Sequence, residues 1–240
     1  MGMHDARSHR PVVAVVGLGI AGSLAVVHLC DGSSSHPQNG PIELLLIDPG
    51  VVAGDLRPHR DSAQRLLSAR VEDMSCYERE ADHFARWLCR RGECPSETGL
   101  TPTWYRYQNY LAHTVGESII QATGSATVRR IKNRVEQIEK TDESGYVLYL
   151  DNGELCRVDS VVMATGLRCA WEPKDGDRWA SRSVDGDVSE SRGSEMGWGP
   201  HAHFLPDHRE MRSSTPVDYV PLLRREAAKV AASVLAVRAS

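Results

Sequence analysis

An apolar run that ends at a glycine constrains the fold more than any other feature of this sequence. Residues 11–16 (Pro-Val-Val-Ala-Val-Val) are typical of a strand buried on both faces. Apolar residues at helical spacing follow, after three glycines. Gly17 permits a tight turn, Gly19 lets the backbone approach a phosphate, and Gly22 allows the helix to pack closely on the strand. This βα unit predicts a site for a dinucleotide pyrophosphate at the positive N-terminal end of the helix.

A second apolar stretch, residues 42–47, ends in an acid, Asp48. An acid at the tip of the second strand suits hydrogen bonding to a ribose hydroxyl and disfavours a 2′-phosphate. Residues 31–40 are rich in Gly, Ser, Pro and Asn, and we expect them to form a loop that lengthens the interval to Asp48. The alternative is a buried βα unit that merely contains glycines.

Length and composition favour one α/β domain, or one domain with a small appendage. The chain has 240 residues, of which 41% are hydrophobic, and a net charge of −4. Acids outnumber the scattered basic residues, so we expect no nucleic acid as a partner. Glycines disfavour residues 11–29 as a membrane helix, since each costs about 1 kcal/mol relative to alanine. We therefore expect a cytoplasmic protein without membrane contact, and its oligomeric state is left open.

The six cysteines show no spacing typical of a metal site. Cys89 and Cys94 have the spacing of a redox pair found in some disulfide reductases. Here, however, Cys89 follows the end of an expected helix and Pro95 interrupts the chain. We therefore expect both to be ordinary reduced thiols, and we expect no metal.

The rest of the chain alternates helical and strand patterns. Helical spacing occurs at residues 78–91, 104–122 and 217–237, and strand patterns at 125–138, 145–150, 155–158 and 159–166, the last ending in small residues. Asp151-Asn152-Gly153 is a hairpin signal between two of these strands. Residues 167–215 are rich in Gly, Ser, Asp and Arg, which predicts a long loop.

These patterns predict an α/β fold: a Rossmann-like domain with a parallel sheet, an inserted antiparallel β-hairpin or meander, and a helical segment. The expected division is an N-terminal tail (1–10), a dinucleotide-binding domain (11–166) with helical (55–122) and β (125–158) insertions, a loop on the substrate side (167–215), and a closing helix that completes the domain (216–240).

The order of these elements resembles FAD-binding flavoproteins of the pyridine-nucleotide-disulfide-oxidoreductase type. More narrowly, two segments resemble the FAD-NAD(P)-binding family of bacterial proteins: Arg65-Leu-Leu-Ser-Ala-Arg-Val-Glu-Asp-Met-Ser75 and Asp82-His-Phe-Ala-Arg-Trp-Leu88. The resemblance covers residues 11–166 and extends to the closing helix. It implies a Rossmann-type FAD-binding domain from a shortened family member, with FAD as cofactor and NAD(P)H bound only transiently.

The resemblance also implies which residues hold FAD. The pyrophosphate would lie against Gly17, Gly19, Ile20, Ala21 and Gly22. The ribose would contact Asp48, and the adenine would lie by Val135. Small residues that leave room under the cofactor would be Ala164, Thr165 and Gly166. The flavin side would be faced by Arg57, Leu67 and Ser68.

The catalytic candidates are not required by any motif. Arg57 and His59 could stabilise a reduced, anionic flavin, or belong to a solvated basic loop. Ser68 stands where family members usually carry asparagine. His201 and His203 would face the same way in an extended strand, where they could line a pocket, lie in solvent, or bind metal if a third ligand were present.

Three functions fit these observations. The first is a compact FAD-dependent oxidoreductase that acts on a small or medium organic substrate of specialised metabolism. Its electrons would come from the substrate, a separate reductase or NAD(P)H. The second is a flavoprotein-fold cyclase or isomerase that orients a biosynthetic intermediate without redox chemistry, because no second glycine-rich site is visible. The third is a non-catalytic nucleotide-binding partner protein.

Overall fold

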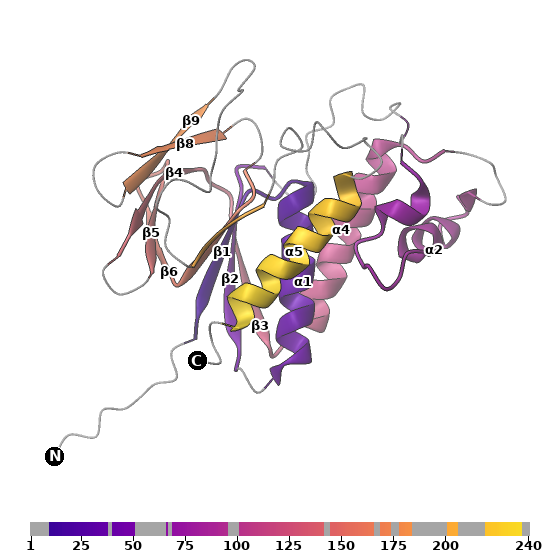
Figure 1. Ribbon diagram of the computed structural model, residues 1–240, viewed down its shortest axis with the longest axis horizontal. Coiled ribbons are helices and arrows are strands. Elements are labelled where there is room, and N and C mark those ends of the chain that lie inside the picture. Colours follow the sequence, from indigo (N-terminus) through magenta and orange to yellow (C-terminus); the bar gives the residue numbers. More distant parts are fainter. Residues whose placement is uncertain are drawn as a thin grey trace.

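The computed structural model describes residues 10–37, 40–50, 66, 69–95, 101–141, 145–165, 169–173, 178–183, 201–205 and 219–236. Within them, two sheets and a layer of helices pack together (Figure 1). The parallel sheet lies in the middle, the helices cover one of its faces, and the antiparallel sheet covers the other.

The central sheet is parallel throughout and has the strand order β10-β7-β1-β2-β3. Its members are β1 (Val12–Val16), β2 (Ile42–Ile47), β3 (Ala126–Ile131), β7 (Ser160–Met163) and β10 (Ala202–Phe204). The inner strands β1, β2 and β7 are almost wholly buried, as apolar strands covered on both faces should be.

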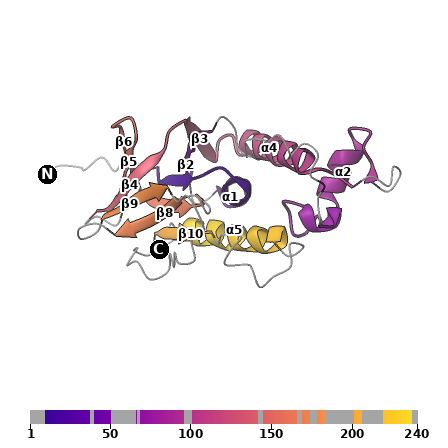
Figure 2. The ribbon, with the colours of Figure 1, turned by 90° about the horizontal axis from the view of Figure 1, so that it is seen from above.

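Three long helices form the layer on one face: α1 (Ile20–Ser35), α4 (Trp104–Gln121) and α5 (Tyr219–Ala236). Their apolar faces share one core with alternate residues of the parallel strands, among them Val13, Val15 and Val162. Two short elements, η2 (Val71–Met74) and α2 (His83–Cys89), extend this layer away from the sheet (Figure 2).

The antiparallel sheet has the strand order β6-β5-β4-β9-β8. It contains β4 (Val135–Lys140), β5 (Tyr146–Leu150), β6 (Leu155–Val158), β8 (Cys169–Pro173) and β9 (Arg178–Ser183). Its buried residues, such as Ile138 and Leu148, meet Val16, Ile47 and Met163 of the parallel sheet in a second core. The predicted α/β class with an added antiparallel sheet is therefore confirmed.

Several predicted elements have the expected bounds, including the second strand at 42–47 and the closing helix. The helix at 104–122 is α4, whose N-cap Thr103 accepts a hydrogen bond from the Arg106 N–H. The hairpin turn is also present. Gly153 has φ +82°, and the Asn152 side chain accepts from the Glu154 N–H at 3.1 Å.

The expected loops and strand bounds were wrong in three places. The stretch 125–138 is two strands in different sheets, because the chain turns at Asn133, whose side chain accepts from the Arg134 N–H. Residues 31–35 continue α1, where the Ser33 hydroxyl donates to the Ser125 carbonyl. Residues 167–215 contain β8, β9 and β10, which form through pairing with distant strands.

The helix expected at 78–91 is only the seven-residue α2. The Ser75 hydroxyl donates to the carbonyls of Tyr77 and Glu80, and this holds residues 75–80 in turns. The helical hydrogen bonds therefore begin only at the α2 N-terminus.

Cys89 and Cys94 are joined in a disulfide, so the prediction of two reduced thiols was wrong. Gly92, with φ +74°, ends α2 in a left-handed turn that brings the chain back toward the helix. Pro95 follows this return instead of preventing it. Three further cysteines whose side chains the structure describes, Cys30, Cys76 and Cys156, are free and buried.

Candidate functional site

The candidate site lies at the carboxyl ends of three neighbouring parallel strands. Gly17 follows β1, Asp48 follows β2, and Ala164 follows β7. The chain passes from β1 to β2 on one side, whereas the strand on the other side of β1 is β7. This is a topological switch point, where open α/β sheets form their ligand crevices.

Any side chain at position 17 would clash with the neighbouring backbone. The φ of Gly17 is +93°, and a Cβ there would lie 2.5 Å from the Ala164 carbonyl oxygen. Backbone hydrogen bonds secure the position: the Gly17 N–H donates to the Ile47 carbonyl at 2.9 Å, and the Ala164 N–H donates to the Val16 carbonyl at 2.8 Å. The turn is thus tied to both neighbouring strands.

Gly22 brings the first turn of α1 against this loop. A Cβ at Gly22 would lie 1.9 Å from the Gly17 carbonyl oxygen, so only glycine permits the approach. The first N–H bonded within the helix is that of Ser23, which donates to the Gly19 carbonyl. The preceding N–H groups have no helical acceptor, the N-cap Gly19 offers no side chain, and no acid lies in the first turn. This helix end is suited to an anion.

Asp48 connects the turn to the end of β2. One carboxylate oxygen accepts from the Leu18 N–H at 2.7 Å, and the other accepts from the Gly50 N–H at 2.7 Å. A carboxylate has about four acceptor positions, so lone pairs are left for ligand hydroxyls. The side chain is half-buried, and it therefore orders the loop and can still face a ligand.

The structure describes only part of the other predicted contacts. Val135 begins β4 with its side chain buried in the second core and its backbone paired with Leu150 of β5, and its contact with adenine stays a prediction. Thr165 is half-buried directly after Ala164. Five predicted residues lie outside the described part of the chain: Arg57, His59, Leu67, Ser68 and Gly166. Their roles stay predictions.

The two late histidines lie at the β10 edge of the parallel sheet. His201 accepts through its carbonyl from the Val161 N–H, and His203 pairs with Val162 of β7. Burial and the neighbouring His201 lower the pKa of His203, so its imidazole is neutral near pH 7. Among the described residues, no three potential metal ligands come together.

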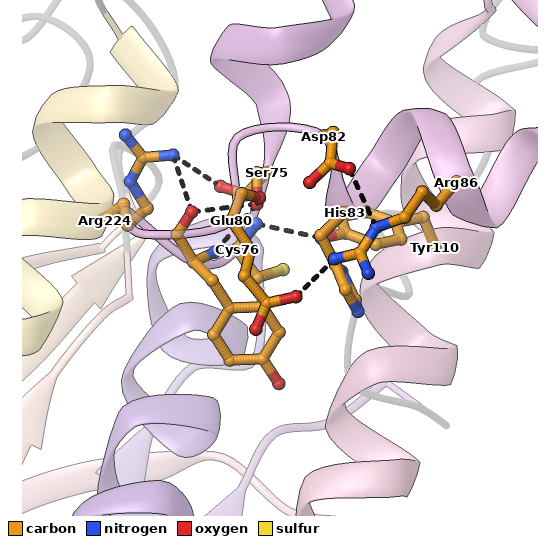
Figure 3. Close-up of polar contacts among 9 residues, drawn as sticks. Ser75, Cys76, Glu80, Asp82, His83, Arg86, Tyr110 and Arg224 are labelled. Carbon is orange, nitrogen blue, oxygen red and sulfur yellow. Dashed lines mark hydrogen bonds and ion pairs between the residues drawn. The ribbon is translucent and has the colours of Figure 1, made fainter.

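Within the helical layer, a buried polar network joins α2, α4, α5 and residues 75–80 (Figure 3). Arg224 of α5 donates to the Ser75 and Tyr77 carbonyls at 3.0 and 3.5 Å. The Tyr110 hydroxyl accepts from the Cys76 N–H at 2.9 Å and lies 2.7 Å from Nδ1 of His83. The tautomer of His83 decides which of these two groups donates in the second contact.

Sequence reasoning missed this network, although one signal was present. Arg224 lies four residues after the buried Val220 and three before the buried Ala227, on the apolar face of the last helix. An arginine there requires partners, because an unpaired buried charge is costly. Its partners are backbone carbonyls, which no side-chain pattern reveals.

Burial also shifts the pKa values of residues on α1 near this network. Burial and the Arg224 charge lower the pKa of His28 to about 4, although Glu78 acts in the opposite direction. Burial raises the pKa of Asp31 to about 6, against a hydrogen bond from Ser118. Both groups titrate outside their usual ranges, so this helix interface responds to pH.

The strand order, the glycine turn and the acid at the end of the second strand define a Rossmann-type dinucleotide-binding domain. A protein-family model described as FAD-NAD(P)-binding matches residues 14–168, more than half of the chain. The chain belongs to this FAD-NAD(P)-binding family. The suspected resemblance is therefore confirmed.

Solved flavoproteins align with part of the chain. A protein assigned as the thioredoxin reductase TrxB of Bacillus anthracis has a TM-score of 0.37 and 12% identity, over 68% of this chain and 38% of that chain. Cyclohexanone monooxygenase from Rhodococcus sp. Phi1 bound to NADP⁺ has a TM-score of 0.44 and 20% identity, over 70% and 28%. A steroid monooxygenase bound to NADP has a TM-score of 0.45 and 17% identity, over 68% and 27%.

This chain thus spans less than two fifths of each of these three proteins. No curated protein sequence matches it. In the described part of the chain, no helix has both the length and the apolar character that a membrane span requires.

Proposed function

We propose that this chain binds FAD through the turn at Gly17–Gly22 and Asp48. The observation that carries the proposal is the close backbone packing at two glycines, which holds the α1 N-terminus against the strand ends. A Cβ at Gly17 would lie 2.5 Å from the Ala164 carbonyl oxygen, and a Cβ at Gly22 would lie 1.9 Å from the Gly17 carbonyl oxygen. A pyrophosphate suits the N–H groups there, and a ribose hydroxyl suits the remaining lone pairs of Asp48. The residues present therefore fit the adenosine-diphosphate half of FAD.

Each described residue has a separate part in holding the cofactor. The N–H groups of Ile20, Ala21 and Gly22 donate to the pyrophosphate, because they precede the first helical hydrogen bond. Asp48 keeps the loop in its binding conformation through Leu18 and accepts from the ribose. Ala164 and Thr165, together with Gly166, leave room beneath the cofactor.

The reaction follows from the family rather than from a catalytic side chain. FAD supplies the electron-transfer chemistry when bound, and the protein supplies binding, orientation and electrostatics. The chain acts as an FAD-dependent oxidoreductase on a small or medium organic substrate of specialised metabolism. Electrons come from the substrate, from a separate reductase, or from NAD(P)H bound transiently. The proposal also includes a cytoplasmic location, with the substrate and a separate reductase as partners.

The cofactor is tested first. The purified chain is titrated with FAD, ADP and NAD by calorimetry, and any bound cofactor is identified by absorbance and mass. We expect ADP to bind in competition with FAD, and the FAD complex to bleach on anaerobic reduction with dithionite. No heat with any of the three nucleotides would refute the proposed site.

The redox role is tested separately by replacing FAD with a redox-inert flavin. Loss of turnover with the inert flavin supports the oxidoreductase. Persistent turnover without consumption of NAD(P)H would instead identify a cyclase or isomerase. Flavin binding without turnover, together with co-purification of a larger protein, would identify a non-catalytic partner.

A further inference from the structure

The disulfide between Cys89 and Cys94 lies where α2 ends, apart from the dinucleotide site. Figure 2 shows α2 at the end of the molecule farthest from the sheets. The two residues are five positions apart, and their Cα atoms are 3.9 Å apart.

The backbone turn that brings the two cysteines together is held by its own hydrogen bonds. The Glu93 N–H donates to the Leu88 carbonyl at 3.1 Å, and the Gly92 N–H donates to the Cys89 carbonyl at 3.0 Å. These two hydrogen bonds, together with a glycine in the left-handed conformation (Gly92, φ +74°), form the Schellman motif that ends many helices. The turn does not need the sulfur–sulfur bond, so it can persist when both thiols are reduced.

Two side-chain contacts also hold this turn, one to α4 and one to α2. The Glu93 carboxylate is ion-paired with Arg106 of α4 at 2.7 Å. The Arg91 guanidinium lies over the Trp87 ring, 3.9 Å from its centroid. The reduced and oxidised forms can therefore share one backbone arrangement, which favours reversible closure.

The chemistry of the pair differs from that of the other described cysteines. Cys89 is exposed and Cys94 is half-buried, whereas Cys30, Cys76 and Cys156 are buried. Burial raises the pKa of Cys30 and of Cys76 to about 12, so these thiols are unreactive near neutral pH. Arginines at positions 90 and 91 stand between the paired cysteines, and positive charge favours a thiolate.

We propose that Cys89 and Cys94 form a reversible thiol–disulfide exchange site that takes a small-molecule disulfide as oxidant and a dithiol as reductant. The exposed Cys89 thiolate attacks one sulfur of the small disulfide, and the other sulfur leaves as a thiolate. Cys94 then attacks the Cys89 sulfur and releases the second thiol. The protein loses two electrons and two protons, and the small disulfide becomes two thiols.

The test equilibrates the full chain at graded ratios of reduced to oxidised glutathione, followed by acid quenching and alkylation. Peptide mass spectrometry reports the state of each cysteine, and circular dichroism reports folding. We expect the pair to pass from dithiol to disulfide while the fold is unchanged, with Cys30, Cys76 and Cys156 unlabelled. A pair that stays in one state throughout, or changes only on unfolding, would overturn the proposal.

Single variants test the roles of the two cysteines. Cys94→Ser should trap one glutathione on Cys89, because the resolving thiol is missing. Cys89→Ser should react at Cys94 roughly tenfold more slowly, because this residue is less accessible. The matched control, Cys156→Ala, should leave the titration unchanged. Equal rates in the two single variants would overturn the assignment of Cys89 as the attacking thiol.

A glycine variant tests whether the turn is already formed before the Cys89–Cys94 disulfide closes. Gly92→Ala puts a side chain at φ +74°, where no atom lies within 4 Å, so only the backbone conformation is disfavoured. Because the reduced and oxidised forms share this turn, the substitution strains both forms alike. We therefore expect Gly92→Ala to leave the midpoint ratio unchanged within about twofold, as should Gly116→Ala of α4, which also has open space. A shift toward more oxidising conditions by roughly fivefold or more in Gly92→Ala alone would refute a turn common to both forms.

Discussion

The Asp48 carboxylate accepts a 2.7 Å hydrogen bond from the N–H of Leu18, thirty positions earlier in the chain. The bond joins the end of β2 to the glycine turn that follows β1. Asp48 therefore acts on the cofactor site in two ways, by shaping the turn and by offering its free lone pairs. These two effects can be separated by measuring stability and nucleotide affinity in the same variants.

Asp48→Ala should weaken ADP binding about tenfold or more and destabilise the free protein by roughly 1.5–3 kcal/mol, because the carboxylate loses charge-assisted bonds to Leu18 and Gly50. Calorimetry with ADP and urea unfolding without nucleotide measure the two effects. Glu43→Gln is the control, since Glu43 lies on the same strand and pairs only loosely with Arg129 at 3.6 Å. An Asp48→Ala protein that binds ADP normally would exclude the ribose role.

Gly22→Ala should destabilise the protein by roughly 1–3 kcal/mol and abolish ADP binding. The added Cβ would lie 1.9 Å from the Gly17 carbonyl oxygen, so the helix must move away from the turn. Gly116→Ala is the matched control on α4, where nothing lies within 4 Å. It should stabilise by about 0.5–1 kcal/mol, since alanine is the better helix former. Urea unfolding and calorimetry distinguish the variants, and unaltered ADP affinity in Gly22→Ala would contradict the proposed cradle.

Tyr110→Phe should destabilise the protein by about 1–3 kcal/mol. The variant leaves the buried Cys76 N–H without its acceptor and removes the hydroxyl that is hydrogen-bonded to His83 Nδ1. Tyr105→Phe removes an exposed hydroxyl from the same helix and should change stability by less than about 0.5 kcal/mol. Thermal or urea unfolding makes the comparison. Equal stability of the two variants would show that the network in Figure 3 contributes nothing to stability.

His28 should make the protein less stable in acid. Its pKa is lowered in the folded state to about 4, from an ordinary value of 6.5, so the unfolded chain binds the proton first as pH falls. The contribution of neutral His28 to the free energy of unfolding is complete above pH 6.5 and is lost progressively down to pH 4. The loss amounts to about 3 kcal/mol, since each unit is worth about 1.4 kcal/mol.

Asp31 acts in the opposite direction, because its raised pKa of about 6 makes the folded protein take up a proton before the unfolded chain does. The free energy of unfolding of the wild type minus that of His28→Gln gives the contribution of His28 to stability. We expect this difference to shrink as pH is lowered from 7 to 4, measured by urea unfolding. Asp31→Asn serves as the second reference, and a difference that does not vary with pH would contradict the shifted pKa of His28.

Much of the fold could be predicted from local patterns. The apolar β-branched run before Gly17, the stretch at 42–47 and the hairpin at Asn152-Gly153 each encode their conformation within a few residues, because side-chain sterics and turn chemistry act locally. The glycine spacing likewise predicted the turn, and the structure supplies the reason: a Cβ at Gly17 or Gly22 would collide with backbone.

The tertiary structure decided what depends on partners far away in the chain. Strands β8, β9 and β10 lie in a stretch without periodicity, and they form because β4 and β7 offer backbone groups to pair with. Arg224 is stable in the core only because it reaches carbonyls nearly 150 positions away. Cys89 and Cys94 meet because a helix ends at a left-handed glycine. The sequence by itself therefore determined the dinucleotide-binding unit and the hairpin of the second sheet, whose geometry is local. Only the folded chain determined the pairing of β8, β9 and β10, the buried network and the disulfide.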